Sequence, residues 1–165
     1  MKNGTIALIA ALFVLSACSA SSSASKKELE AAEFELTASL IESGSYQFTI
    51  RSASPSGGKT IQITSLYTMT ARDGKYEAHL PYFGRVYSGG YGDSGGIEFN
   101  GEPENLQITR NDDKNKISVT FNINSDTEQY TVMLDMGATA FGNLVISSQK
   151  KQVISYYGLA SGLKD

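Results

Sequence analysis

Cys18 is the only thiol in the chain, and the residues before it have the spacing of an acylation signal. Leu15, Ser16 and Ala17 precede it, and small residues at these positions let a peptidase reach the backbone. This order resembles the bacterial lipobox, in which the cysteine sulfur carries a diacylglycerol. We therefore predict that Cys18 is a lipid-attachment site and that residues 1–17 are a signal peptide, removed in the mature chain.

The segment before this motif has the features of a signal peptide. Lys2 supplies a positive charge, and an apolar run follows from Ile6 to Leu15. The run is too short to cross a bilayer, which needs about 20 apolar residues. Residues 18–25 are mainly serine and alanine, so we expect the lipidated cysteine to be followed by a flexible linker. A single domain would then occupy residues 26–165.

The residues after Cys18 also bear on location. Acidic residues there act as a surface-export signal in some lipoproteins, whereas this chain has serines. We therefore expect a cell-envelope protein that is anchored by its lipid to the outer membrane and faces the periplasm. The formal net charge is −3, and no basic block is present. Because nucleic-acid binding depends on neutralising phosphates, we expect no nucleic-acid partner.

A serine-protease site is the next chemistry that the residues suggest. Gly92 to Gly96 reads Gly-Asp-Ser-Gly-Gly, the order around the nucleophile of chymotrypsin-like proteases. Such a serine needs a histidine base and an acid that orients this base. His79 is the only histidine, and it lies on the polar face of a predicted strand, close before Ser94 in sequence. We therefore interpret the segment as a glycine-rich turn and assign no catalytic residue.

Metal binding has little support in the sequence. No cluster of histidines and cysteines exists to hold zinc or iron. Asp112, Asp113 and Asn115 offer oxygen ligands, but the spaced acids and closing glutamate of a calcium loop are missing. We expect a solvated turn there, and we predict no metal site and no cofactor.

Tyr82, Phe83 and Arg85 form the remaining candidate site. They follow Pro81, which ends a strand because proline has no N–H to donate. If exposed, these side chains could clamp a ligand or partner, since tyrosine and arginine are common hot-spot residues. If buried, the segment would cross between two sheets with Arg85 at the rim. We favour burial, and we keep the three residues as the candidate partner- or ligand-binding site.

A helix is predicted at the start of the domain. Ser25 and Glu28 fit the N-cap and third position of a capping box, and Gly44 suits the C-terminal stop. Leucine and alanine residues at helical spacing form the main apolar stripe of this helix. Phe34 and Ile41 lie off this stripe, so the helix can touch two surfaces. We expect it to pack on the domain's own sheet rather than on a partner. The main stripe, at helical spacing, is made up of Leu29, Ala32, Leu36 and Leu40.

The rest of the chain alternates between apolar and polar residues, which predicts strands with one buried face. The alternation is strict over residues 46–50, 117–123 and 130–136. The fold class that we predict is therefore all-β with one N-terminal α-helix, arranged as an antiparallel β-sandwich or a flattened barrel. Further turns are expected at residues 111–115 and 149–151.

One hairpin can be specified residue by residue. Asp73-Gly74 suits a two-residue type I′ turn, which needs positive φ at both positions. Arg72 then lies opposite Lys75, and the burial pattern selects the same register as the turn. The apolar face of this hairpin pairs Ala71 with Tyr76, Met69 with Ala78, and Tyr67 with Leu80; its polar face carries Thr68 with His79 and Thr70 with Glu77.

Three stretches resemble the domain of unknown function 4251 family, whose members are envelope proteins of Bacteroidetes and often lipoproteins. They are Leu-Pro-Tyr-Phe-Gly-Arg over 80–85, Gly-Gly-Ile-Glu-Phe over 95–99 and Ile-Ser-Tyr-Tyr-Gly over 154–158. The resemblance covers about Ala31 to Gly158 and implies an envelope location and a β-rich fold, without an activity or cofactor. It leads us to expect an arginine where this chain has Lys151.

The sequence has a lipid-attachment motif but no recognisable set of catalytic residues. This combination favours a non-catalytic binding or interaction module of the envelope. The membrane would be contacted through the N-terminal lipid, and the partner would be an envelope protein, a glycan or a small apolar ligand. Two alternatives stay open. One is a lipocalin-like carrier, which needs an enclosed apolar cavity of roughly 300 Å³ or more. The other is a hydrolase with paired carboxylates that converge in a cleft.

Overall fold

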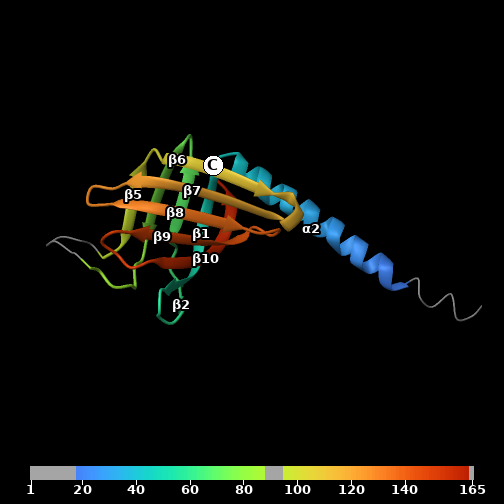
Figure 1. The fold of residues 1–165 in the computed structure, drawn as a ribbon, viewed down its shortest axis with the longest axis horizontal. Coiled ribbons are helices and arrows are strands. Elements are labelled where there is room, and N and C mark those ends of the chain that lie inside the picture. The colour runs from blue at the N-terminus through green and yellow to red at the C-terminus, as the bar shows by residue number, and fades with distance from the viewer. Residues whose placement is uncertain (1–17, 88–94, 164–165) are drawn as a thin grey trace, which may run out of the picture.

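The computed structural model describes residues 18–87 and 95–163 (Figure 1). Within these ranges the chain forms one α-helix, a short 3₁₀ turn (η1) and a set of antiparallel strands. The elements in chain order are α2 (Cys18–Glu42), β1 (Tyr46–Pro55), β2 (Ile61–Gln62), β3 (Thr68–Arg72), β4 (Lys75–Leu80), β5 (Ile97–Gly101), β6 (Glu104–Asn111), η1 (Asp112–Lys114), β7 (Lys116–Asn124), β8 (Gln129–Met136), β9 (Phe141–Ser148) and β10 (Ile154–Gly162).

The strands form a single curled sheet. Its order is β5-β4-β3-β1-β10-β9-β8-β7-β6, with β2 paired to β1 beside β3. β5 and β6 are the two edges, yet only Glu102 and Pro103 connect them. Two residues cannot span a flat sheet of this width, so the edges meet at one corner and the sheet forms a half-barrel. The predicted antiparallel β class is confirmed, in the barrel-like rather than the two-sheet arrangement.

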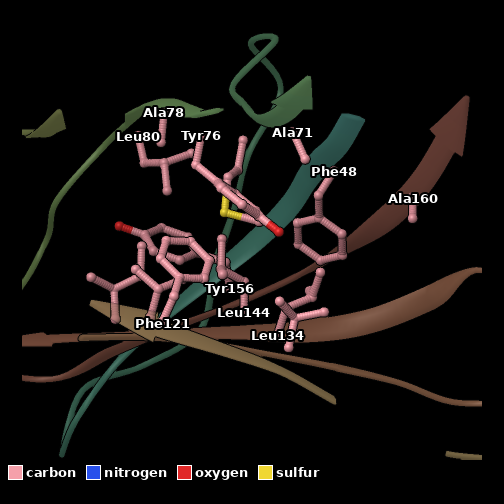
Figure 2. Packing of buried hydrophobic residues seen from close by; sticks show 14 of the residues in the cluster. Phe48, Ala71, Tyr76, Ala78, Leu80, Phe121, Leu134, Leu144, Tyr156 and Ala160 are labelled. Carbon is pink, nitrogen blue, oxygen red and sulfur yellow. The ribbon is translucent and has the colours of Figure 1, made fainter. Parts of the chain in front are cut away.

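Aromatic side chains fill the inside of the half-barrel (Figure 2). The ring of Tyr76 on β4 lies 4.2 Å from that of Phe121 on β7, measured between centroids. Phe99 on β5 lies 6.4 Å from Phe121 and 6.0 Å from the ring of Tyr130 on β8. These contacts connect strands from opposite ends of the sheet, β4 and β5 with β7 and β8, across the interior. The inside of the half-barrel is therefore a packed core.

The predicted hairpin is confirmed between β3 and β4. Arg72 pairs with Lys75, and the register continues to Thr68 opposite His79. The predicted pair of Tyr67 with Leu80 lies beyond this register, and the ring of Tyr67 stacks on His79 instead. Asp73 and Gly74 have φ values of 51° and 77°, as a type I′ turn requires. The turns at residues 111–115 and 149–151 also join strands as predicted.

The helix α2 begins earlier than the sequence predicts. Its end matches the prediction, since Gly44 follows it with φ of 64°. Its start lies at Cys18 instead of after Ser25, so the backbone of the expected flexible linker is helical. Once a helix is nucleated, adding serine and alanine residues costs little, because each new residue adds a hydrogen bond. No helix of the described residues is both long and apolar enough to cross a membrane.

The face that α2 buries differs from the predicted stripe. Leu29 and Leu36 are 61% and 75% exposed, whereas Phe34 and Ile41 are fully buried with Thr37 and Ala38. At 100° per residue the two sets lie on nearly opposite sides of the helix. Both are equally periodic, so periodicity could not choose between them. The helix thus packs on the domain's own sheet as expected, through the side that carries Phe34 and Ile41, while Leu40 is the member of the leucine stripe that packs partly against the core.

The C-terminal half of α2 covers one end of the half-barrel. The hydroxyl of Thr37 donates to the carbonyl oxygen of Ala138, in the turn between β8 and β9, at 3.1 Å. Arg110 on β6 lies over the ring of Phe34 at 5.3 Å and makes ion pairs with Glu35 and Glu42. The N-terminal half of the helix projects away from the domain (Figure 1).

Candidate functional site

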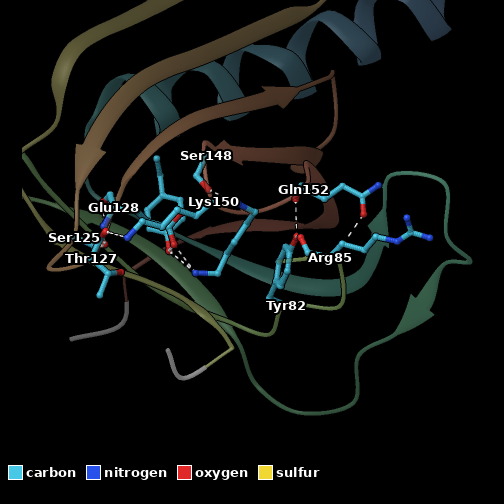
Figure 3. Close-up of polar contacts among 10 residues, drawn as sticks. Tyr82, Arg85, Ser125, Thr127, Glu128, Ser148, Lys150 and Gln152 are labelled. Carbon is cyan, nitrogen blue, oxygen red and sulfur yellow. Dashed lines mark hydrogen bonds and ion pairs between the residues drawn. The ribbon is translucent and has the colours of Figure 1, made fainter. Parts of the chain in front are cut away.

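The segment 81–87, which follows β4, is held by the hydroxyl of Tyr82 (Figure 3). This oxygen lies 2.7 Å from the carbonyl oxygen of Arg85 and 2.9 Å from that of Gln152. Burial raises the pKa of Tyr82, and it outweighs the opposing hydrogen bond to the backbone of Gln152. The tyrosine thus stays a neutral donor that ties the segment to itself and to the β9–β10 turn.

Gln152 joins the segment to two other parts of the chain. Its backbone N–H donates to the carbonyl oxygen of Arg85 at 2.9 Å, and its side-chain oxygen accepts from the N–H of Arg85 at 3.3 Å. Its side-chain nitrogen donates to the carbonyl oxygen of Ser56, in the β1–β2 connection, at 2.7 Å. Val86 forms an isolated β-bridge with Lys151 beside it. The segment therefore behaves as a short extra strand with a fixed position.

Gly84 is required by the way Tyr82 folds back. A Cβ atom on Gly84 would lie 2.4 Å from the hydroxyl oxygen of Tyr82 and 2.7 Å from the ring carbon that carries it. Such distances are far below van der Waals contact, so a larger residue displaces the ring. On the other side of the segment, the hydroxyl of Tyr156 donates to the carbonyl oxygen of Pro81 at 2.8 Å.

The structure corrects the expected burial of the candidate residues. Tyr82 is half-buried, but Phe83 is 42% exposed and Arg85 is also exposed. The physical reason is that the segment does not cross between two sheets. It runs along the outside of the β9–β10 turn, where the position toward the core is occupied by Lys151.

Phe83 and Arg85 border a cleft of about 430 Å³. The side chain of Arg85 extends away from Gln152 (Figure 3), and its guanidinium has no hydrogen-bond or ion-pair partner among the described residues. The turn after β1 forms the opposite wall of this cleft. The full lining consists of Pro55, Ser56, Gly57, Gly58, Phe83, Gly84, Arg85 and Gln152.

A buried ion pair lies beneath the segment. The side chains of Glu128 and Lys151 are each only 3% exposed, and Lys151 Nζ contacts Glu128 Oε1. The hydroxyl of Tyr130 donates to the same carboxylate oxygen at 2.9 Å. Lys151 Nζ also lies 5.8 Å from the centroid of the Tyr130 ring, within cation–π range. Since the backbone of Lys151 bridges to Val86, the pair anchors the segment to the core.

The pKa values in this cluster follow from burial and the ion pair. Burial alone would raise the pKa of Glu128, but hydrogen bonds from Lys151, Ser148 and Tyr130 lower it below its ordinary value. Burial alone would lower the pKa of Lys151, but Glu128 and Tyr130 raise it instead. Burial and the hydrogen bond to Glu128 raise the pKa of Tyr130 to about 12. The pair is therefore fully ionised near neutral pH.

His79 lies elsewhere, on the outer face of β4. Its Nδ1 is 2.9 Å from Oε1 of Glu98, and its ring stacks on that of Tyr67 at 6.1 Å. Both members of the pair are more than half exposed, and no hydroxyl or thiol of the described residues is bonded to the histidine. Such a pair stabilises two neighbouring strands.

The other residues considered from the sequence are also dispersed. Asp112 pairs with Arg110 at 2.6 Å, and Asn115 has φ of 46° in the turn after η1, as in a solvated hairpin turn. Ser94 lies outside the described residues, whereas Gly95 beside it has φ of 69°. In the parts of the chain that the structure describes, no three histidine, cysteine or acidic side chains are grouped to hold a metal ion.

Two residues of the site, Gln152 and Glu128, were missed by sequence reasoning, and Lys151 was noted only as a lysine where an arginine was expected. Glu128 and Lys151 lie in different turns, and nothing in either turn marks it as a partner of the other. The only local indication of a buried ion pair was that each charged residue lies next to a strand with strict alternation of apolar and polar residues. The structure brings Tyr82, Phe83 and Arg85 together as predicted from their adjacency in sequence, and it leaves His79 and Asp112 apart from them.

Comparison with known proteins gives a consistent result. The family described as Domain of unknown function (DUF4251) matches residues 28–160. The crystal structure of a DUF4251 family protein from Bacteroides eggerthii DSM 20697 superposes with a TM-score of 0.63 at 12% identity, covering 82% of this chain and 91% of that chain. At this identity the likeness concerns the fold alone. No curated protein matches the chain. The match over most of its length shows that the chain belongs to the domain of unknown function 4251 family.

Proposed function

We propose that the mature chain is a lipid-anchored protein of the cell envelope and acts as a non-catalytic binding module through the cleft beside Phe83 and Arg85. The observation that carries the proposal is the guanidinium of Arg85, which has no partner among the described residues although its backbone is fixed by Gln152. The fixed backbone limits the entropy cost of binding to the ordering of the side chain, about 0.5–1.5 kcal/mol. The exposed ring of Phe83 adds an apolar contact at the same place.

The anchor is supported by the sequence and by the position of α2. Residues 1–17 have the pattern of a signal peptide, and Cys18 follows a lipobox-like motif. Cys18 also opens a helix that projects from the domain, so acyl chains on its sulfur would reach a membrane without contact from the sheet (Figure 1). We propose the outer membrane as the anchoring membrane, and a position facing the periplasm because serines rather than acids follow the cysteine.

The carrier and hydrolase alternatives fit the geometry less well. A carrier needs an enclosed apolar cavity, but Tyr76 and Phe121 meet across the interior of the half-barrel. A hydrolase with a general acid needs a carboxyl of raised pKa, whereas the pKa of the buried Glu128 is lowered. Within residues 18–87 and 95–163, no carboxylate lines the cleft of Phe83 and Arg85.

The anchor is tested with Cys18→Ser. This substitution removes the only sulfur that can take a diacylglycerol, so metabolic labelling with a tagged fatty acid should fail. The protein should also move from the membrane fraction to the soluble fraction, because each buried CH₂ contributes about 0.8 kcal/mol to anchoring. Unchanged labelling of the Cys18→Ser chain contradicts a lipid at this position.

The binding function is tested by affinity capture with the full tethered chain from native envelope. Material that the wild-type chain retains should be lost with Arg85→Ala. The matched control is Arg72→Ala, because Arg72 is another exposed arginine and lies at the opposite end of β4. Equal capture by the wild type and both variants would mean that the cleft does not bind.

A further inference from the structure

The cleft beside segment 81–87 has a local charge opposite to that of the chain. The chain carries a formal net charge of −3, yet among the described residues the only ionisable side chain in the cleft lining is the basic Arg85. An anionic group is therefore attracted to this site, while most of the surface repels it.

Exposed apolar side chains lie close in sequence to the charged group, and Phe83 lines the same cleft. Phe83 and Val86 are each about two-fifths exposed, and Val153 has a similar exposure on the other side of Gln152. Tyr87, at the end of the segment, is 66% exposed. Their exposure leaves apolar area in water that a ligand would cover, at about 25 cal/mol per Å². A ligand that matches this site has an apolar part as well as a negative charge.

The geometry of the Arg85 guanidinium favours a carboxylate over a phosphate as the bound anion. A single guanidinium presents two parallel N–H donors that match the two oxygens of one carboxylate. Phosphate sites gather several donors, such as a helix N-terminus or a group of arginines and lysines. The described lining of the cleft has one arginine and no helix. A carboxylate is therefore the anion that the site fits.

The location of the cleft limits where the ligand comes from. At one end of β9, Ala138 bonds to α2, and at the other end Gln152 bonds to segment 81–87. The eight residues of β9 separate these ends by about 25 Å. The helix from Cys18 to Phe34, its first buried residue, adds up to about 24 Å. The cleft thus lies at the end of the domain away from the lipid.

We propose that this cleft binds a small amphipathic carboxylate, an anion whose single carboxylate pairs with Arg85 while its apolar group packs on Phe83. The inference rests on the proposed binding function and specifies its ligand. The volume of about 430 Å³ is in the range of small-ligand sites. The ligand is taken from the aqueous side that faces away from the anchoring membrane.

The test compares two ligands that differ only in charge. N-acetyl-phenylalanine carries a carboxylate, and N-acetyl-phenylalaninamide carries a neutral amide on the same apolar group. Titration of the mature chain, residues 18–165 with Cys18→Ser, is followed by ligand-observed NMR. The acid should bind at least about tenfold more tightly than the amide, as expected for a charge-assisted hydrogen bond. Arg85→Ala should remove this preference, and Arg72→Ala should leave it unchanged.

The other outcomes overturn the proposal in distinguishable ways. Equal binding of acid and amide rejects the carboxylate but leaves a binding cleft. Tighter binding of benzyl phosphate than of the acid assigns the site to phosphate instead. Failure of all three ligands, with Arg85-dependent capture from the envelope intact, rejects a small ligand and retains the binding module. Matching thermal melts of both arginine variants confirm that the comparisons involve folded protein.

Discussion

At the scale of single residues, Gly84 tests how segment 81–87 keeps its conformation. Gly84→Ala places a methyl group 2.4 Å from the hydroxyl oxygen of Tyr82, so the ring must move away from the carbonyl oxygens of Arg85 and Gln152. We expect a loss of roughly 1–3 kcal/mol in the free energy of unfolding, because buried polar groups lose their partners. Urea denaturation followed by fluorescence or circular dichroism measures it.

The matched control for this substitution is Gly101→Ala. A Cβ atom on Gly101 meets no heavy atom within 4 Å, so this variant should unfold at nearly the wild-type urea concentration. Similar stability of the Gly84 and Gly101 variants would mean that Tyr82 does not hold the segment in the way that the contacts indicate.

The ion pair of Glu128 and Lys151 gives a prediction about pH. The folded-state pKa of Glu128 is lowered, so its contribution to stability is present above the unfolded pKa of about 4.3. This contribution is lost as the pH falls from there through the folded pKa. Glu128→Gln should cost roughly 3–5 kcal/mol at pH 7, because it leaves Lys151 charged and buried without its carboxylate.

Thermal melts between pH 7 and pH 3 check this expectation. The stability difference between the wild type and Glu128→Gln should begin to shrink below about pH 4, where the unfolded-state carboxylate takes up a proton, and should continue to shrink as the pH falls through the lowered folded-state pKa. The double variant Glu128→Gln with Lys151→Met is the control, since removing both charges should restore part of the stability. A stability difference that stays constant over this pH range contradicts the assignment of the lowered pKa to Glu128.

The residues of the site show where sequence reasoning stops. Phe83 and Arg85 could be selected by type, but their exposure depends on Gln152, which is far away in the chain. The expected arginine at position 151 is a lysine, and the structure shows that this position is buried against Glu128. Long-range partners of this kind have no periodic or turn signal, so the sequence could name candidates but could not place them.

At the scale of elements, the residues of a turn predicted the pairing of two strands, whereas the helical period of α2 did not predict which of its faces is buried. Asp73-Gly74 fixed the register of β3 and β4 because only certain residues accept positive φ at both turn positions. In α2, two apolar stripes have the same helical period, and the one with Phe34 and Ile41 is buried. The ring of Phe34 fills the open end of the half-barrel. The size of that opening depends on the sheet, so it could not be predicted from the sequence of the helix alone.

A pair of substitutions on α2 tests this assignment. Phe34→Ala removes a fully buried ring that also lies under the guanidinium of Arg110, so it should cost roughly 3–5 kcal/mol. Leu36→Ala changes a side chain that is 75% exposed and should shift stability by less than about 0.5 kcal/mol. Chemical denaturation of both variants gives the comparison. The opposite ranking would restore the leucine stripe as the packed face.

At the scale of the whole molecule, the strand order joins the two ends of the domain. β1, the first strand, pairs with β10, the last one, and β10 also pairs with β9. The last strand therefore lies in the middle of the sheet, and each half needs it as a neighbour. Gly158 fits this position because a Cβ there would lie 2.4 Å from the carbonyl oxygen of Thr49 on β1. The fold cannot be completed until the C-terminal strand is available.

This arrangement predicts different effects for two truncations. A chain that ends at Val153 lacks β10, which leaves β1 and β9 with unpaired edges and exposes the places of Ile154, Tyr156 and Ala160 in the core. It should show no cooperative unfolding transition, since buried backbone groups and apolar area lose their partners together. A chain that ends at Gly162 keeps β10 and should unfold like the full-length protein. Calorimetry and near-UV circular dichroism distinguish the two, and a cooperative transition in the shorter chain would mean that the β3–β5 and β6–β9 groups fold independently.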